Sequence, residues 1–318
     1  MTQLSVKVVS KVVEAIDIVS LELASTDGKP LPSFSAGAHI DVHLPGGIIR
    51  QYSLLNDASE QHRYVIGVLK DPESRGGSIA VHDKVNVGDI LQISAPRNHF
   101  ELVPAQRTLL FAGGIGVTPI LCMAHRLSQT SAEFEMHYCT RSPDRTAFQK
   151  DIQASKFADR VHFHFDSGSD DQKLNLKALV AGPSSSTHLY VCGPSGFIDY
   201  VVNTAKEAGW SSEQIHFEYF GAADIDTSGD QAFKVKIAST GAVFDVEADQ
   251  SITQVLEANG VFVPVSCEEG VCGTCLTRVL EGVPEHRDMY LTEAEQAAND
   301  QILPCCSRAR SSVLVLDL

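Results

Sequence analysis

The residues with the most distinctive chemistry in this chain are its cysteines. Five of the eight fall between positions 267 and 306, and three of these follow the pattern C-x4-C-x2-C: Cys267, Cys272 and Cys275. Cys305 and Cys306 follow, with 29 residues between Cys275 and Cys305. This spacing is typical of a plant-type [2Fe–2S] site, in which four thiolates hold two irons. A zinc site would more often show two C-x2-C pairs. The sequence therefore predicts an iron–sulfur cluster with one of the two adjacent cysteines as fourth ligand.

Two motifs in the first hundred residues could bind a ligand with a phosphate group and a flat ring. They are Arg50-Gln51-Tyr52-Ser53, in a β-rich run at 48–55, and Ser74-Arg75-Gly76-Gly77-Ser78, before a helical segment at 78–83. A tyrosine ring offers a flat face, and a guanidinium binds phosphate bidentately. Glycines before a helix expose amide donors to a phosphate. Each motif alone is also compatible with an ordinary strand or surface turn.

Two loops further on are typical of a nucleotide site. The first, Gly113-Gly114-Ile115-Gly116-Val117-Thr118-Pro119, joins an expected strand at 108–112 to a helix at 117–128. It departs from the Rossmann pattern because Pro119 stands at the third position, but its glycines still allow a pyrophosphate to approach. The second, Cys192-Gly193-Pro194, ends a strand at 187–192, where α/β sheets bind ligands. Arg141 follows a strand at 133–139 and should approach the adenosine side. Cys192 by itself could equally be a buried core thiol.

The expected elements divide the chain into three parts. Residues 1–103 contain short strands at 39–44, 48–55, 63–69 and 89–94, which predicts an antiparallel β-barrel. Residues 104–224 alternate strands and helices up to a last strand at 215–220, which predicts a parallel, doubly wound α/β domain. A polar, acidic stretch at 222–230 is the expected linker. Residues 231–318 hold a hairpin around Thr240-Gly241, a helix at 251–260, the cysteine loop and a closing strand. The predicted fold class is multidomain.

These motifs, in this order, resemble the phthalate dioxygenase reductase family, whose ferredoxin-reductase-type flavoproteins carry a C-terminal plant-type ferredoxin. The stretches AGAHIDVHLPGG, IRQYSL, FAGGIGVTPILCMA and SCEEGVCGTCLTRVL look closest to vanillate O-demethylase reductases. The resemblance implies a β-grasp [2Fe–2S] domain with Cys305 as the fourth ligand. It implies FMN rather than FAD at Arg50, Gln51, Tyr52, Ser53, Gly76, Gly77 and Ser78. It also implies NADH, with NADPH as the alternative, at Gly113, Gly114, Gly116, Pro119, Arg141, Gly193 and Pro194. Finally, it implies that Thr118 faces the flavin edge, that Cys192 lines the nicotinamide pocket and that Phe220 shields the flavin.

The same resemblance implies an electron path from NADH through FMN and the cluster to a separate Rieske-type oxygenase, met in a transient complex by a monomeric reductase. The flavin is needed because a hydride carries two electrons and a cluster accepts one. Other acceptors stay open: a carnitine-type or phthalate-type oxygenase, a haem monooxygenase or ferric chelates. A redox sensor is a further alternative, but a sensor needs neither NADH nor flavin.

Composition limits the classes of partner. The 318 residues carry a net charge of −15, and an acidic surface disfavours nucleic acid. No apolar run is long enough for a membrane span or a signal peptide, so we expect a cytoplasmic protein without a membrane partner. Residues 230–318 hold 14 acidic and 6 basic side chains, a net charge of −8. This last part could therefore be attracted to a basic partner.

Overall fold

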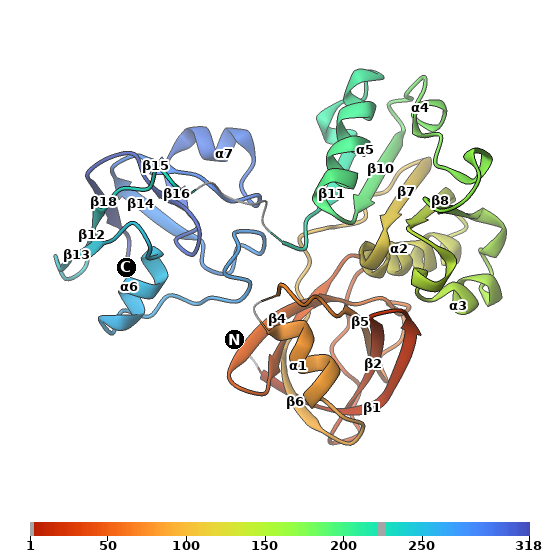
Figure 1. Cartoon of the computed structure of the whole chain (residues 1–318), viewed down its shortest axis with the longest axis horizontal. Helices are drawn as coiled ribbons and strands as arrows, with labels where there is room; N and C mark the ends of the chain where they lie inside the picture. The colour runs from red at the N-terminus through yellow and green to blue at the C-terminus, as the bar shows by residue number, and fades with distance from the viewer. Residues whose placement is uncertain (1–2, 75, 222–226) are drawn as a thin grey trace. The chain divides into compact units, whose positions relative to one another are not determined.

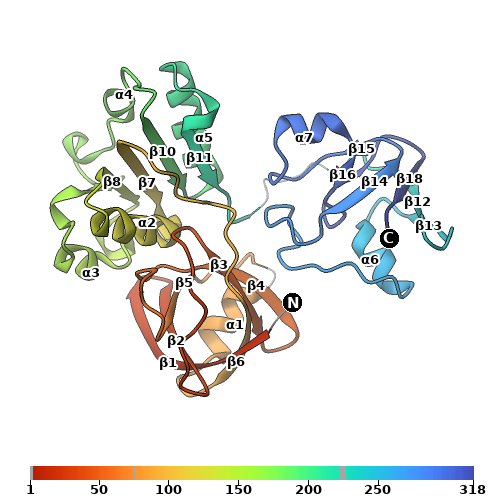
Figure 2. The same ribbon diagram turned by 180° about the vertical axis from the view of Figure 1, so that it is seen from behind.

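The computed structural model describes residues 3–74, 76–221 and 227–318. The chain forms two compact units, Met1–Glu218 and Tyr219–Leu318. Figure 1 draws the first unit from red to green and the second mainly in blue, and Figure 2 shows both from behind.

The first unit begins with a six-stranded antiparallel sheet that closes on itself. Its strand order is β4-β3-β6-β1-β2-β5. An isolated bridge between Leu54 and Ile66 joins the ends of this order, directly after β4 and within β5. Along β1, Val6 and Val8 are fully buried while Lys7 and Val9 are exposed, as the period of a strand requires. The elements are β1 (Gln3–Ala15), β2 (Ile18–Ser25), β3 (His39–Leu44), β4 (Ile48–Ser53), β5 (Tyr64–Leu69), α1 (Gly77–Lys84) and β6 (Ile90–Ser94).

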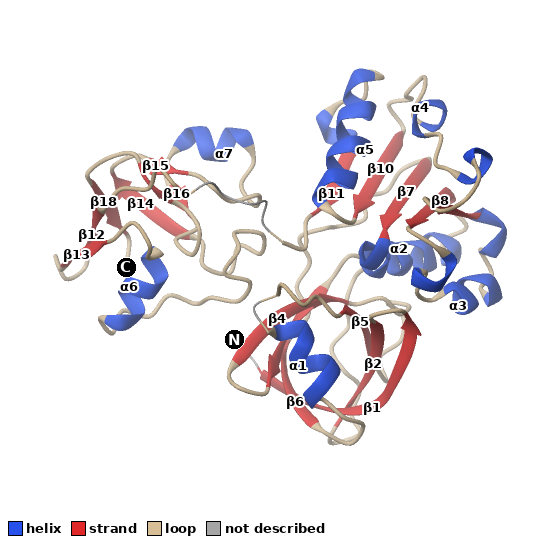
Figure 3. Ribbon diagram, viewed as in Figure 1, coloured by secondary structure: helices blue, strands red, loops and turns tan. Residues whose placement is uncertain are grey.

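The rest of the first unit is a five-stranded parallel sheet in the order β11-β10-β7-β8-β9, with helices packed against it (Figure 3). Helix α2 shares one apolar core with Leu110 of β7 and Tyr190 of β10. The elements are β7 (Arg107–Gly113), α2 (Val117–Gln129), β8 (Glu133–Thr140), α3 (Gln149–Ala154), β9 (Val161–Phe165), α4 (Leu176–Leu179), β10 (Thr187–Cys192), α5 (Ser195–Glu207) and β11 (Ile215–Glu218).

The second unit is built on a mixed sheet in the order β13-β12-β18-β14-β16, with a separate pair, β15-β17. Strands β12 and β18 run parallel, and Gly241, with a φ of +72°, turns the chain from β12 into β13. The elements are β12 (Phe233–Ile237), β13 (Val243–Val246), α6 (Ile252–Ala258), β14 (Thr277–Glu281), β15 (Pro284–Glu285), α7 (Glu293–Ala298), β16 (Gln301–Ile302), β17 (Arg308–Ala309) and β18 (Val313–Leu316).

The predicted fold class is confirmed: a closed antiparallel sheet, a parallel α/β sheet and a small mixed sheet follow one another along the chain. The last parallel strand ends at Glu218 instead of residue 220. The sequence did not predict the short elements β14 to β17 and α7. Within the expected linker, residues 222–226 lie outside the described residues, and the boundaries of the three domains stay predictions. Among the described residues, no helix is long and apolar enough to cross a membrane.

Candidate functional site

The four predicted cluster ligands lie together in the second unit. Cys267, Cys272, Cys275 and Cys305 are all buried, with exposed fractions between 2% and 8%. The Cys267 thiol interacts with the thiols of Cys272 and Cys305, and Cys305 also interacts with Cys275. The contact with Cys272 lowers the pKa of Cys267, and the contact with Cys305 lowers that of Cys275. Four buried sulfurs that face one another, with acidified thiols among them, are the donor set that an iron–sulfur cluster needs.

Backbone amides support these sulfurs. The Glu269 amide donates to Cys267 Sγ at 3.3 Å, and the Thr274 amide donates to Cys272 Sγ at 3.5 Å. Such bonds stabilise thiolates and tune a bound cluster. The loop reaches this geometry through Gly270 and Gly273, whose φ angles are +74° and +68°. A Cβ on Gly273 would lie 2.3 Å from the Tyr290 ring, so glycine is required there for both backbone and space.

The adjacent cysteines have different surroundings. Cys305 is 8% exposed and interacts with Cys267 and Cys275. Cys306 is half-buried beside it, with its sulfur 3.7 Å from the Leu303 carbonyl oxygen and 3.8 Å from Ser307 Oγ. A Cβ on Gly270 would lie 2.4 Å from the Cys306 sulfur, so Cys306 packs behind the loop. This placement favours Cys305 as the fourth ligand.

In the first unit, β4 brings the predicted flavin residues to the start of α1. The Arg50 side chain lies over Gly77, where an added Cβ would be 2.5 Å from Arg50 Cγ and 2.9 Å from its Nε. Gly76 adopts a φ of +81°, and among the described residues no side chain caps the first turn of α1. A guanidinium beside uncapped amide donors suits a phosphate group. Arg75 lies outside the described residues.

The other residues of these two motifs have separate contacts. Burial raises the pKa of the Tyr52 hydroxyl. The Ser78 hydroxyl lies 2.9 Å from that of Ser74 and holds the turn before α1. Gln51 is not brought to the phosphate loop, because its amide donates to Asp41 Oδ1 at 3.1 Å. Gln51 and Ser78 thus have contacts within the protein, and the assignment of the motif residues to a flavin stays a prediction.

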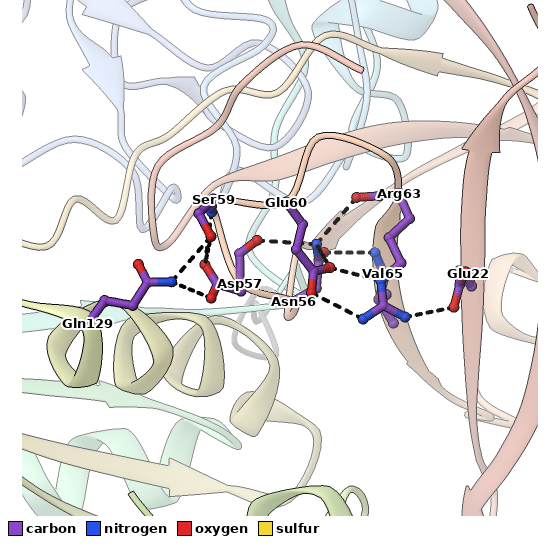
Figure 4. A network of polar contacts seen from close by, with 8 residues as sticks. All are labelled: Glu22, Asn56, Asp57, Ser59, Glu60, Arg63, Val65 and Gln129. Carbon is purple, nitrogen blue, oxygen red and sulfur yellow. Dashed lines mark hydrogen bonds and ion pairs between the residues drawn. The ribbon is translucent and has the colours of Figure 1, made fainter. Parts of the chain in front are cut away.

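A polar network anchors the segment that follows β4 (Figure 4). Asn56 accepts from the Val65 amide at 2.9 Å and donates to Glu60 at 3.1 Å, and Arg63 binds Glu60 at 2.8 Å. At the far end of α2, the Gln129 amide donates to an Asp57 carboxylate oxygen. The network therefore fixes the segment after β4 relative to α2. Its members are Glu22, Asn56, Asp57, Ser59, Glu60, Arg63, Val65 and Gln129.

The two nucleotide loops pack backbone against backbone at the carboxyl edge of the parallel sheet. A Cβ on Gly116 would lie 2.3 Å from the Cys192 carbonyl oxygen, and one on Gly193 would lie 2.9 Å from Gly113 Cα. A Cβ on Gly113 would lie 3.0 Å from Cδ of Pro194. Only glycines permit this approach, which leaves amide groups available to a dinucleotide.

Three further predicted residues lie around these loops. Pro119 is buried in the first turn of α2, and Gly114 lies in the preceding turn. Thr118 is also buried; its hydroxyl donates to the Ile115 carbonyl at 3.1 Å. A Cβ added to Gly67 of β5 would lie 2.9 Å from the methyl carbon of Thr118, so Thr118 contacts the closed sheet. Arg141 is exposed after β8.

Where the closed sheet meets the parallel sheet, the structure reveals a residue that the sequence motifs missed. Glu218 pairs with Cys192 in register, and its carboxyl interacts with the Ser53 hydroxyl at the end of β4. Its Oε2 is buried and has no hydrogen-bond partner within the described ranges. Burial raises the pKa of Glu218 to about 8, partly offset by Ser53. Burial also raises the pKa of the fully buried Cys192 thiol.

Phe220 was the aromatic that the sequence favoured near this point. It lies two residues beyond β11, in the second unit, and is 40% exposed. Its role as a shield for the flavin stays a prediction. Glu218 lies two residues before Phe220, within the last strand expected from the sequence, but an acidic residue at a strand end is not by itself distinctive.

Comparison with known proteins agrees with this arrangement. A 2Fe-2S iron–sulfur cluster binding domain matches residues 235–310, and the N-terminal domain of a dimethylamine monooxygenase subunit, DmmA-like, matches residues 95–215. Vanillate O-demethylase oxidoreductase from Pseudomonas sp. strain HR199 is 59% identical over 305 residues, which are 96% of each chain.

Two solved structures are similar along almost the whole chain. Phthalate dioxygenase reductase, described as a modular structure for electron transfer from pyridine nucleotides to [2Fe–2S], is 40% identical with a TM-score of 0.78. The match covers 99% of this chain and 98% of that one. A type IV self-sufficient cytochrome P450 monooxygenase is 36% identical with a TM-score of 0.85, over 99% of this chain and 41% of that chain. The present chain therefore belongs to the family of flavin- and iron–sulfur-dependent oxidoreductases that includes the vanillate O-demethylase oxidoreductases and phthalate dioxygenase reductase.

Proposed function

We propose that this chain is the reductase component of a two-component, vanillate O-demethylase-like oxygenase. It takes electrons from NADH and delivers them through FMN and a [2Fe–2S] cluster to a separate Rieske-type oxygenase. The observation that carries the proposal is that one chain holds both a buried four-cysteine site and a strand-end site that joins Ser53, Cys192 and Glu218. The relatives that share this architecture along their full length support it.

Each group of residues has a defined task in this proposal. When bound, the flavin accepts a two-electron hydride and releases electrons singly, as a pyridine nucleotide and a cluster together require. Arg50 and the amides at the start of α1 bind its phosphate. Gly113, Gly116 and Gly193 let the dinucleotide approach the backbone, and the buried Cys192 side chain excludes water from the nicotinamide pocket. Cys267, Cys272, Cys275 and Cys305 bind the irons.

Glu218 contributes a proton-holding group to this site. With a pKa of about 8, its carboxyl is mostly neutral at pH 7 and can donate a hydrogen bond. A neutral group also places no negative charge beside the position where electrons arrive. We infer that Glu218 and Ser53 together hold a proton at the point where the closed sheet meets the parallel sheet.

Reconstitution tests the proposal. The purified chain, loaded with flavin and iron, is mixed with NADH, vanillate and a vanillate demethylase oxygenase, and formaldehyde is measured against NADH consumed. Near one-to-one coupling is the expected result. Rapid NADH oxidation without formaldehyde would contradict the vanillate assignment but keep the reductase. No NADH oxidation, even with ferricyanide, would contradict the enzyme itself.

A haem monooxygenase is the second candidate acceptor. The similarity to a self-sufficient P450, in which this chain corresponds to 41% of the polypeptide, favours it. The same reductase preparation, offered a haem monooxygenase in place of the Rieske-type oxygenase, distinguishes the two by which acceptor is reduced at the higher rate. A monomeric state and a cytoplasmic location remain predictions from the sequence.

A further inference from the structure

The second unit presents an unusually exposed aromatic side chain, Phe262, shortly before the cluster loop, residues 267–275. Phe262 is 84% exposed, more than any other large apolar side chain in the described part of the chain. Most phenylalanines of a folded domain are buried, because moving an aromatic side chain out of water is favourable. An aromatic ring left in water points to a partner that covers it.

The backbone that carries Phe262 is held in place. Residues 261–267 leave the end of α6 and run to the first ligand, Cys267 (Figure 1). Val263 is buried in the core of the unit, and Val261 and Val265 pack against that core. Phe262 and Pro264 alternate with them and face solvent. The ring is therefore presented by a segment that packing fixes, which lowers the entropy lost on binding.

The ring is also within reach of the cluster. Cys267 lies five positions after Phe262, and an extended chain of that length spans at most about 17 Å. Residues 262–267 thus carry an exposed aromatic side chain at one end and a predicted cluster ligand at the other. A partner that covers the ring lies beside the cluster loop, where an electron acceptor must be.

The charge around this segment selects the kind of partner. From Ile237 to Thr277 the sequence contains no lysine, arginine or histidine, but it contains six carboxylates. Asp245 is bound by Lys234 at the edge of the sheet, and the other five are Glu247, Asp249, Glu257, Glu268 and Glu269. An apolar anchor within a purely acidic stretch fits a surface with an apolar recess and a rim of lysine and arginine.

We propose that Phe262 is the anchor by which the second unit docks on the oxygenase component, whose docking surface is an apolar recess with a basic rim. This inference rests on the proposed function and adds the contact residue and the chemistry of the partner surface. Aromatic anchors carry a large share of interface free energy, while the surrounding charges set the association rate and its salt dependence.

The test compares Phe262→Ser with Val243→Ser, which removes another exposed apolar side chain, 51% exposed on β13 of the same unit. Oxygenase turnover is measured against oxygenase concentration, and the reduction of the cluster by NADH is followed in a single turnover without oxygenase. We expect Phe262→Ser to raise the apparent KM for the oxygenase about tenfold, with an unchanged maximal rate and unchanged cluster reduction. Phe262→Leu should recover part of the loss, and Val243→Ser should match the wild type. Added salt should raise the KM of wild type and variants alike.

Three results would overturn the inference. An unchanged KM in Phe262→Ser, with normal wild-type coupling, would show that the ring makes no contact with the oxygenase. Slower cluster reduction in Phe262→Ser would mean that the ring contacts the first unit of its own chain. A lower molecular mass of Phe262→Ser in solution would mean that the ring contacts a second copy of the chain. A wild type that reduces no oxygenase would instead refute the proposed function, and this inference with it.

Discussion

The buried carboxyl of Glu218 should set the alkaline limit of NADH oxidation. Its Oε2 has no hydrogen-bond partner in the described part of the chain, and burial raises its pKa to about 8. With that pKa, about nine tenths of the molecules hold the proton at pH 7 and about one tenth at pH 9. Loss of the proton would leave a charge next to Cys192, at the place where electrons arrive, and would remove a hydrogen-bond donor. The rate should therefore fall about tenfold between pH 7 and pH 9.

Glu218→Gln tests this reasoning because an amide keeps the shape of the side chain and cannot ionise. NADH-dependent ferricyanide reduction is measured at saturating NADH across the same pH range. The wild type should show the fall, and the glutamine variant should be nearly flat. Glu207→Gln, an exposed glutamate at the end of α5, is the matched control and should keep the wild-type profile. An unchanged alkaline fall in Glu218→Gln would refute the assignment of the pKa to this carboxyl.

Three further predictions concern the cofactor sites. Cys305→Ser should abolish the absorption of the cluster and electron transfer to the oxygenase but leave NADH-dependent ferricyanide reduction largely intact. Cys306→Ser, the control, should keep all three properties. Loss of every activity in Cys305→Ser would mean that the cluster is structural. Arg50→Lys should weaken FMN binding about tenfold in a fluorescence titration, because an ammonium replaces a bidentate guanidinium; an unchanged affinity would remove Arg50 from the phosphate site. Gly273→Ala should lower iron content and thermal stability, because its φ of +68° and the Tyr290 ring exclude a Cβ; a full cluster complement in this variant would contradict that reasoning.

The sequence predicted best where chemistry imposes a fixed spacing. Three cysteines on one tight loop can meet a distant fourth only if the loop turns back on itself, so their spacing already implied the buried convergence that the structure describes. The glycines of the nucleotide loops were predictable for the same reason. Gly116 and Gly193 lie where two backbones touch, and no other residue fits there.

The sequence could not predict relationships between elements that are far apart in the chain. Gln51 belongs to the same motif as Arg50, yet its contact is Asp41 on the neighbouring strand, because successive side chains of a strand point to opposite faces. The strands β15, β16 and β17 were missed because each contains two residues, too few to show a period.

Glu218 shows why such relationships decide function. On its own strand it is a polar residue at a strand end, and such residues are common. It becomes distinctive only because the parallel register places it opposite Cys192, and because the closing of the first sheet brings the end of β4, with Ser53, to the same point. The end of β4 lies more than a hundred residues before the other two segments, and all three must fold before the carboxyl loses its water and its pKa rises. The proton that we assign to this site is therefore a property of the folded first unit, and it can be tested independently of the cysteine spacing that identified the cluster.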